Sequence, residues 1–161
     1  MEKQYNQCIE IPIIINGKEI RTGNVSEVVM PTEHSHVLAK FHKADKETVQ
    51  KAIEAALEAR KKWENVHWID RCSIMLRAAE LLAGKYRYVI NAATMLGQGK
   101  NPFQAEIDSA CETIDFLRFN VHYASKIYAQ QPLSDNSAIN RLEYRGLEGF
   151  VYAISPFNFT S

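Results

Sequence analysis

The sequence has little that would indicate nucleic acid or a membrane as a partner. Its 161 residues carry 19 basic and 19 acidic side chains, so the formal net charge is zero, and proteins that bind nucleic acid or anionic membranes usually carry a positive excess. No apolar run is longer than Ile11–Ile15, which is far too short to span a bilayer. The first residues include Glu2 and Glu10 and show no targeting pattern. We therefore expect neither partner.

Metal ligands and candidate nucleophiles are also scarce. The three cysteines, Cys8, Cys72 and Cys111, have an odd count and no metal-ligand spacing, which favours a reducing compartment. Cys72 and Cys111 fall within helical patterns, where a buried inert thiol is commoner than a reactive one. His34 and His36 could offer two metal ligands, but a third is missing. The sequence therefore predicts no metal site.

Short strands are predicted in the first quarter of the chain. Ile11–Ile15 and Lys18–Arg21 flank Asn16-Gly17, a pair that suits the two positive-φ positions of a type I′ hairpin turn. Val28-Val29 and the alternating apolar residues of 37–41 indicate further short strands.

Four helices are predicted between residues 45 and 129. Asp45 is expected to cap the first, Asp70 to cap a second that ends at Gly84, and a third is expected from about Lys85 to Leu96, stopped by Gly97. The fourth starts at Asn101-Pro102, a cap followed by proline, and its apolar residues recur at steps of three and four as far as about Ala129. Residues 97–100 contain Gly, Gly and Lys but lack the spacing of a phosphate-binding loop, so a helix end and turn is the better interpretation.

The last thirty residues are expected to return to extended structure. After a loop at 130–136, Leu142 and Tyr144 alternate with charged residues, which is typical of a half-exposed strand. Phe150–Ile154 is an unbroken apolar run that suits a strand buried on both faces of a parallel sheet. Ser155-Pro156 ends it, and 157–159 would lie at the carboxyl edge, where open α/β sheets bind ligands. The predicted class is α/β, but with a single central strand the sheet is incomplete and the helices should expose large apolar faces.

Three blocks carry a resemblance to a known family. They are 44–60, 95–108 and 144–160, the last containing Pro156-Phe-Asn-Phe159. This segment resembles the aldehyde dehydrogenase superfamily, and Gln104–Asp108 with Arg145–Gly149 resembles its Δ1-pyrroline-5-carboxylate (L-glutamate 5-semialdehyde) dehydrogenase branch. The likeness runs from about Ile9 to the end of the sequence.

The resemblance implies a division of the chain. Residues 9–43 would form the hairpin and short strands of an oligomerisation ribbon, and 44–130 the helical part of an NAD-binding domain. Residues 131–148 would be a loop and ribbon strand, and 149–161 the first central strand with its oxyanion loop. The chain would thus be the amino-terminal portion of the family's fold.

The resemblance also implies a role for Asn158. The asparagine of this motif donates its side-chain amide to the oxyanion that forms when a thiol attacks an aldehyde. A lone loop asparagine more often bonds its own backbone, and the surrounding motif is what favours the catalytic interpretation.

Further residues carry implied binding roles. Phe159 would line the aldehyde tunnel, Ile154, Ser155 and Phe157 would lie against the nicotinamide-ribose side of NAD, and Glu106 would lie near the ammonium end of the substrate. The alternatives stay open, because the aromatic rings could simply fill the core and Glu106 could be a solvated helix charge.

The implied function is oxidation of L-glutamate 5-semialdehyde to L-glutamate with NAD, in proline catabolism. The family's nucleophilic cysteine and general-base glutamate match nothing in these residues, so we expect residues 1–161 alone to be inactive. An alternative is a catalytically dead helical protein that associates with full-length subunits through its apolar faces. A third possibility is an aldehyde dehydrogenase with another substrate.

The resemblance further implies a small-molecule aldehyde substrate and a homo-oligomer when complete. It implies the mitochondrial matrix if the source is eukaryotic, and the cytoplasm otherwise. No transit peptide is visible in the sequence.

Overall fold

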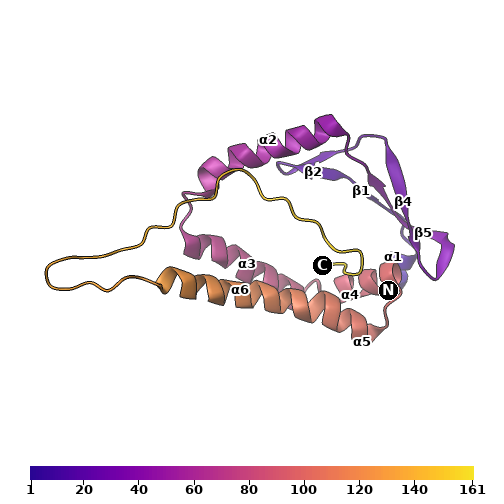
Figure 1. Ribbon diagram of the computed structural model, residues 1–161. Helices are drawn as coiled ribbons and strands as arrows, with labels where there is room; N and C mark the ends of the chain where they lie inside the picture. The colour runs from indigo at the N-terminus through magenta and orange to yellow at the C-terminus, as the bar shows by residue number, and fades with distance from the viewer.

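Residues 1–161 are described by a computed structural model, in which the strands lie at one end and the long helices extend away from them (Figure 1). After the short helix α1 (Glu2–Tyr5), the strands β1 (Ile9–Ile11), β4 (Val25–Met30) and β5 (Glu33–His42) form a sheet in the order β1-β5-β4. β1 runs parallel to β5 and β4 runs antiparallel to it. The predicted mixed α/β class is confirmed.

The hairpin predicted from Asn16-Gly17 is present. β2 (Ile13–Ile15) and β3 (Lys18–Ile20) pair antiparallel as a separate two-stranded sheet. Both turn residues adopt positive φ, 50° at Asn16 and 73° at Gly17, as a type I′ turn requires.

The first helix begins as predicted and the second does not. α2 (Lys46–Trp63) is capped by Asp45, whose carboxylate accepts the backbone N–H of Thr48 at 2.8 Å. α3 (Trp68–Ala83) begins two residues before Asp70, and the ring of His67 accepts the N–H of Ile69 at its start. The prediction that Asp70 caps this helix is wrong; its charge lies in the first turn instead, where the helix dipole favours it.

α4 (Arg87–Gln98) runs two residues past the predicted stop. Gly97 stays within the helix, whereas Gly99 adopts the left-handed conformation, with φ 66°, and its N–H bonds the carbonyl of Met95. Gly99 is the glycine that takes a positive φ here, and sequence spacing alone did not distinguish it from Gly97.

The long fourth helix is confirmed as a continuous helical rod, which we define as α5 (Pro102–Ala105), η1 (Glu106–Cys111) and α6 (Glu112–Ala129). Asn101 and Gln104 exchange side-chain bonds with each other's backbone N–H in a capping box at its start. η1 is a stretch of π-helix, in which the N–H of Glu112 bonds the carbonyl of Ile107 five residues earlier. The sequence did not indicate this widened turn.

The rod packs along α3, and the two run side by side in Figure 1. Ala79 of α3, with Ala110 and Ile114 of the rod, forms the buried cluster between them. At the far end the rings of Trp68 and Tyr128 stack with centroids 4.8 Å apart. None of the helices is both long and apolar enough to cross a membrane.

The last thirty-two residues form no strand, so the predicted strands at 142–144 and at 150–154 are wrong for this chain. The segment leaves the end of α6, turns back, passes α2 and ends beside α4 (Figure 1). Val151 is 82% and Ile154 is 74% exposed, because no neighbouring strand lies beside them to complete a ladder. Only 11 of the 161 residues are buried, which confirms the expected exposure of apolar faces.

Candidate active-site loop and its anchor

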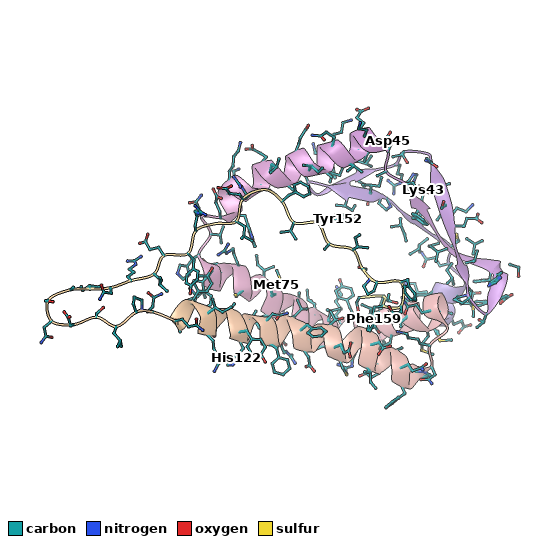
Figure 2. All side chains as sticks on the ribbon, in the orientation of Figure 1. Lys43, Asp45, Met75, His122, Tyr152 and Phe159 are labelled. Atoms are coloured by element: carbon teal, nitrogen blue, oxygen red, sulfur yellow. The ribbon has the colours of Figure 1, made fainter.

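The terminal loop, residues 157–161, folds back onto η1. A turn at Phe157-Asn158 is closed by a 3.4 Å bond from the N–H of Phe159 to the carbonyl of Pro156. Beyond it, Ser161 Oγ donates to the carbonyl of Ser109 at 2.9 Å and lies 2.8 Å from Thr113 Oγ1. Figure 2 shows Phe159 close to the helices, whereas Tyr152 lies on the segment that crosses the open side of the molecule. The loop is therefore attached to the rod at the π-turn.

Lys100 connects this loop to η1. Its ammonium nitrogen lies 2.5 Å from Asp108 Oδ2 and 2.6 Å from the backbone carbonyl oxygen of Asn158. It also lies 4.8 Å from the centroid of the Phe159 ring, within the range of a cation–π contact. The Lys100 side chain is only 17% exposed, so water screens these interactions less than at a surface lysine.

Glu106, at the start of η1, is held by two residues of α4. The guanidinium of Arg87 donates to Glu106 Oε1 through both Nε, at 2.9 Å, and Nη2, while Asn91 Nδ2 donates to Oε2 at 2.5 Å. The Arg87 guanidinium and then the Asn91 amide hold the pKa of Glu106 below its ordinary value. The carboxylate is therefore a fixed negative charge at neutral pH.

Ser109 completes the π-turn from within. It is fully buried, and its hydroxyl lies 2.6 Å from the carbonyl of Ala105 and 3.0 Å from Asn91 Oδ1. A serine that bonds the carbonyl four residues earlier competes with the helical ladder and favours a local distortion. Because Asn91 also donates to Glu106, the π-turn, α4 and the carboxylate form one hydrogen-bonded unit. Such π-turns occur frequently at functional sites.

The predicted site residues are only partly brought together. Asn158 and Phe159 meet η1, the turn that carries Glu106, through Lys100. Ile154, Ser155 and Phe157 are exposed, with Phe157 98% exposed, and no second element lies over them. The assigned roles stay predictions.

Sequence reasoning missed the residues that bind Glu106 and the Asn158 loop and fix their positions. Arg87 and Asn91 lie four positions apart, a spacing that places them on one face of α4, but no carboxylate near them in sequence marked them as a pair. Lys100 was considered only as part of a phosphate loop. The sequence feature that could have identified Lys100 is its position between Gly99, which ends one helix, and Asn101, which starts the next.

A cavity of about 630 Å³ lies elsewhere, between the first sheet and α4. Ile9, Val28, Leu38, Val89 and Thr160 are among its lining residues, and no predicted site residue is. No group of three or more His, Cys, Asp or Glu side chains is placed to hold a metal ion.

The α/β arrangement can now be compared with known proteins. The aldehyde dehydrogenase family model matches residues 19–161, and the chain belongs to this family. It is 54% identical over 154 residues to a probable delta-1-pyrroline-5-carboxylate dehydrogenase of Schizosaccharomyces pombe, covering 95% of this chain and 28% of the relative. The human mitochondrial delta-1-pyrroline-5-carboxylate dehydrogenase is 52% identical over 151 residues, covering 94% of this chain and 27% of that protein.

Comparison with solved structures gives the same family as comparison with sequences. The crystal structure of the delta-pyrroline-5-carboxylate dehydrogenase of Mycobacterium tuberculosis, 45% identical, superposes with a TM-score of 0.94 and covers 98% of this chain and 30% of that chain. The same enzyme has also been solved with NAD bound. The chain thus matches the amino-terminal part of the aldehyde dehydrogenase fold and spans about 30% of the length of these relatives.

Proposed function

We propose that residues 1–161 form the amino-terminal portion of an NAD-dependent dehydrogenase that oxidises L-glutamate 5-semialdehyde to L-glutamate. The observation that carries the proposal is the attachment of the Asn158 loop, through Lys100, to the turn that bears Glu106. The relatives that match nearly the whole chain are named for this chemistry. We call the natural polypeptide that contains residues 1–161 the native protein.

In this proposal Asn158 stabilises the oxyanion. Its backbone carbonyl is bound by Lys100, while its side chain lies on the exposed turn, where its amide N–H groups remain available to a substrate oxygen. A donor fixed before the reaction stabilises the developing negative charge without reorganising. The attacking thiolate and the general base would come from residues outside 1–161, because none of Cys8, Cys72 and Cys111 lies in a motif that resembles the family's nucleophile.

Glu106 is proposed to attract the substrate's ammonium group. Its Oε1 is occupied by Arg87, but Oε2 receives only the Asn91 amide, and a carboxylate oxygen can accept more than one hydrogen bond. The fixed negative charge would then contribute to the preference for an amino-acid aldehyde over a simple one. Phe159, half-buried beside Lys100, would pack against the aliphatic part of the substrate.

Ile154, Ser155 and Phe157 would contact NAD, which accepts the hydride. The exposed faces of these side chains fit that role, since nothing in residues 1–161 covers them. Assembly as a homo-oligomer is part of the same proposal. Because relatives such as the human protein are mitochondrial, we propose the mitochondrial matrix as the location if the source is eukaryotic.

The test is a steady-state assay of the native protein with NAD and either L-glutamate 5-semialdehyde or a simple aldehyde of similar length. We expect the semialdehyde to be preferred, and Asn158→Ala to lower kcat roughly 100- to 1000-fold, the usual cost of removing one oxyanion donor. Asn140→Ala, in the exposed 131–148 segment, is the matched control and should leave kcat unchanged. Equal turnover of both aldehydes would favour another substrate class.

A helical interaction protein is the second candidate, favoured by the apolar side chains that residues 1–161 leave exposed. The intact mass of the native protein, captured with an antibody to this segment, separates the two functions. A mass several times the 18.4 kDa of residues 1–161 supports the enzyme. A mass near 18.4 kDa, without dehydrogenase activity, supports the interaction protein.

A further inference from the structure

We infer that Lys100 is a positioning residue for the oxyanion donor: its ammonium group fixes the Asn158 loop against η1. This inference rests on the proposed function, since it assigns a role to Lys100 within that site. It also gives a purpose to the glycine-rich turn at 97–100, which the phosphate-loop pattern did not explain.

The ammonium group of Lys100 contacts three partners. Lys100 Nζ has three N–H donors, and one reaches Asp108 Oδ2 at 2.5 Å while another reaches the Asn158 carbonyl at 2.6 Å. The Phe159 ring occupies the remaining side, at 4.8 Å. These partners come from η1 and from two adjacent residues of the terminal loop, so one charge joins two segments that are fifty residues or more apart.

Lys100 lies in the short connection between α4 and the rod, and the backbone is fixed on both sides of it. On one side Gly99 closes α4 in the left-handed conformation. On the other, the Asn101–Gln104 capping box starts the rod. A lysine carries more side-chain entropy than most residues, and it makes a precise anchor only where its backbone and its contacts are both constrained.

Lys100 holds Asn158 by a backbone atom. Lys100 binds the backbone carbonyl, not the side-chain amide, so it can fix the residue and leave the amide free to donate. Misplacing a catalytic group by about 1 Å can lower a rate about a hundredfold. Loss of the anchor should therefore lower kcat, with a smaller effect on KM through Phe159, whose ring lies beside the same ammonium group.

The kinetic test is a double-mutant cycle in the native protein. We expect Lys100→Met to lower kcat roughly 10- to 100-fold and to change KM by a smaller factor, because the position of the oxyanion donor matters chiefly in the transition state. In an Asn158→Ala background the same substitution should change kcat less than about twofold, since no amide remains to be positioned. Equal effects in both backgrounds would overturn the inference and indicate a merely structural lysine.

Two further variants separate positioning from misfolding. Lys100→Met leaves the Asp108 carboxylate without its partner, so Lys100→Met/Asp108→Asn, which removes both charges, should fold and still show the kcat loss. Lys126→Met, at an exposed lysine of α6, should change neither kcat nor KM. A double variant with normal kcat would contradict the inference.

A spectroscopic measurement that does not depend on activity tests the Lys100 anchor independently of the proposed function. With 4-fluorophenylalanine incorporated, the ¹⁹F signal of Phe159, assigned by its loss in Phe159→Leu, should shift in Lys100→Met and not in Lys126→Met, because the charge beside that ring has been removed. An unchanged signal would refute the anchor even in an active enzyme. A shifted signal in a protein without semialdehyde activity would support the anchor and refute the proposed function.

Discussion

At the scale of single residues, two charge pairs organise the candidate site, and each joins a different pair of segments. Arg87 and Glu106 join α4 to η1, whereas Lys100 and Asp108 bring the terminal loop to the same π-turn. All four side chains are partly buried. Partly buried pairs with additional hydrogen bonds matter more than the exposed pairs on α2, such as Glu47–Lys51, which contribute little.

The Glu106 pair gives a prediction about pH. Hydrogen bonds from Arg87 and Asn91 lower the pKa of Glu106 from its ordinary value of 4.5. A group whose pKa is lower in the folded state stabilises the fold above its ordinary pKa, and that stabilisation is lost as the pH falls through the folded-state pKa. We expect Glu106→Gln to lower the Tm of the native protein at pH 7, with the difference shrinking as the pH falls below about 4.5.

Thermal unfolding followed across this pH range checks the prediction. Glutamine keeps the shape of the side chain and can still accept the Asn91 amide, so the comparison isolates the charge. Glu148→Gln, at an exposed position in the extended segment, is the control and should show no such trend. A Tm difference for Glu106→Gln that stays the same down to the lowest pH would show that charge is not the cause.

At this scale the sequence predicted features formed by residues that are close together along the chain, and it missed contacts between residues that are far apart. The cap at Asp45 and the turn at Asn16-Gly17 were predicted correctly, because each involves residues within three positions of each other. Glu106 was proposed as a site residue, but its partner Arg87 lies 19 positions away and Asn158 lies 58 positions from Lys100. No local rule connects such pairs, so the anchors of the site became visible only in the fold.

At the scale of elements, the helical rod depends on how it starts. Asn101 accepts the N–H of Gln104 at 2.9 Å, and Gln104 accepts the N–H of Asn101 at 3.0 Å. These bonds satisfy donors that the first turn leaves unpaired. The same connection holds Lys100, so the stability of the helix start and the position of the terminal loop are coupled.

The capping box predicts opposite effects for one substitution at two places. Asn101→Ala should destabilise the native protein by about 1 kcal/mol, because the cap is lost. Asn120→Ala, at an exposed interior position of α6, should be neutral or slightly stabilising, because alanine has the higher helix propensity. Urea denaturation of both variants measures the difference. Equal losses of stability would mean that the cap contributes nothing beyond the loss of an asparagine.

Helices and strands were predicted well where residues nearby in sequence determine them, and poorly where they depend on segments that are distant in sequence. The rod was predicted from its start at Asn101 to its end at Ala129, because apolar period and capping are local. Phe150–Ile154 has the composition of a strand, yet it forms none here, because a strand needs a partner beside it. The π-turn at η1 depends on Asn91 and Ser109 meeting between two helices, which no periodicity encodes.

At the scale of the whole molecule, residues 1–161 have a larger solvent-accessible surface than a folded monomer of the same mass would have. Residues 1–161 have an accessible surface of 12176 Å², whereas a folded monomer of 18.4 kDa would expose about 8,200 Å². The excess, about 4,000 Å², is comparable to an obligate interface. Among its contributors are Phe116 and Phe119 of α6, Ile74 of α3 and the side chains of 150–154. Within the aldehyde dehydrogenase family fold, we propose that further strands and helices cover these faces.

This excess predicts how residues 1–161 behave when they are produced alone. We expect the isolated chain to bind the dye ANS strongly and to self-associate at micromolar concentration, because ANS reports exposed apolar surface and uncovered faces of this size associate. The native protein, at equal concentration of this segment, should bind far less dye. Sedimentation velocity and ANS fluorescence, measured on the same samples, provide the comparison.

The interaction-protein alternative makes the same experiment informative in a second way. Adding the native protein to the isolated chain should leave ANS binding unchanged if the apolar faces of the native protein are already covered by its own residues. Loss of ANS fluorescence with formation of a mixed complex would instead support the alternative. An isolated chain that is monomeric, binds no dye and unfolds cooperatively would contradict both the expected self-association and the interaction-protein alternative. Such a chain must cover its apolar faces with residues 1–161 alone.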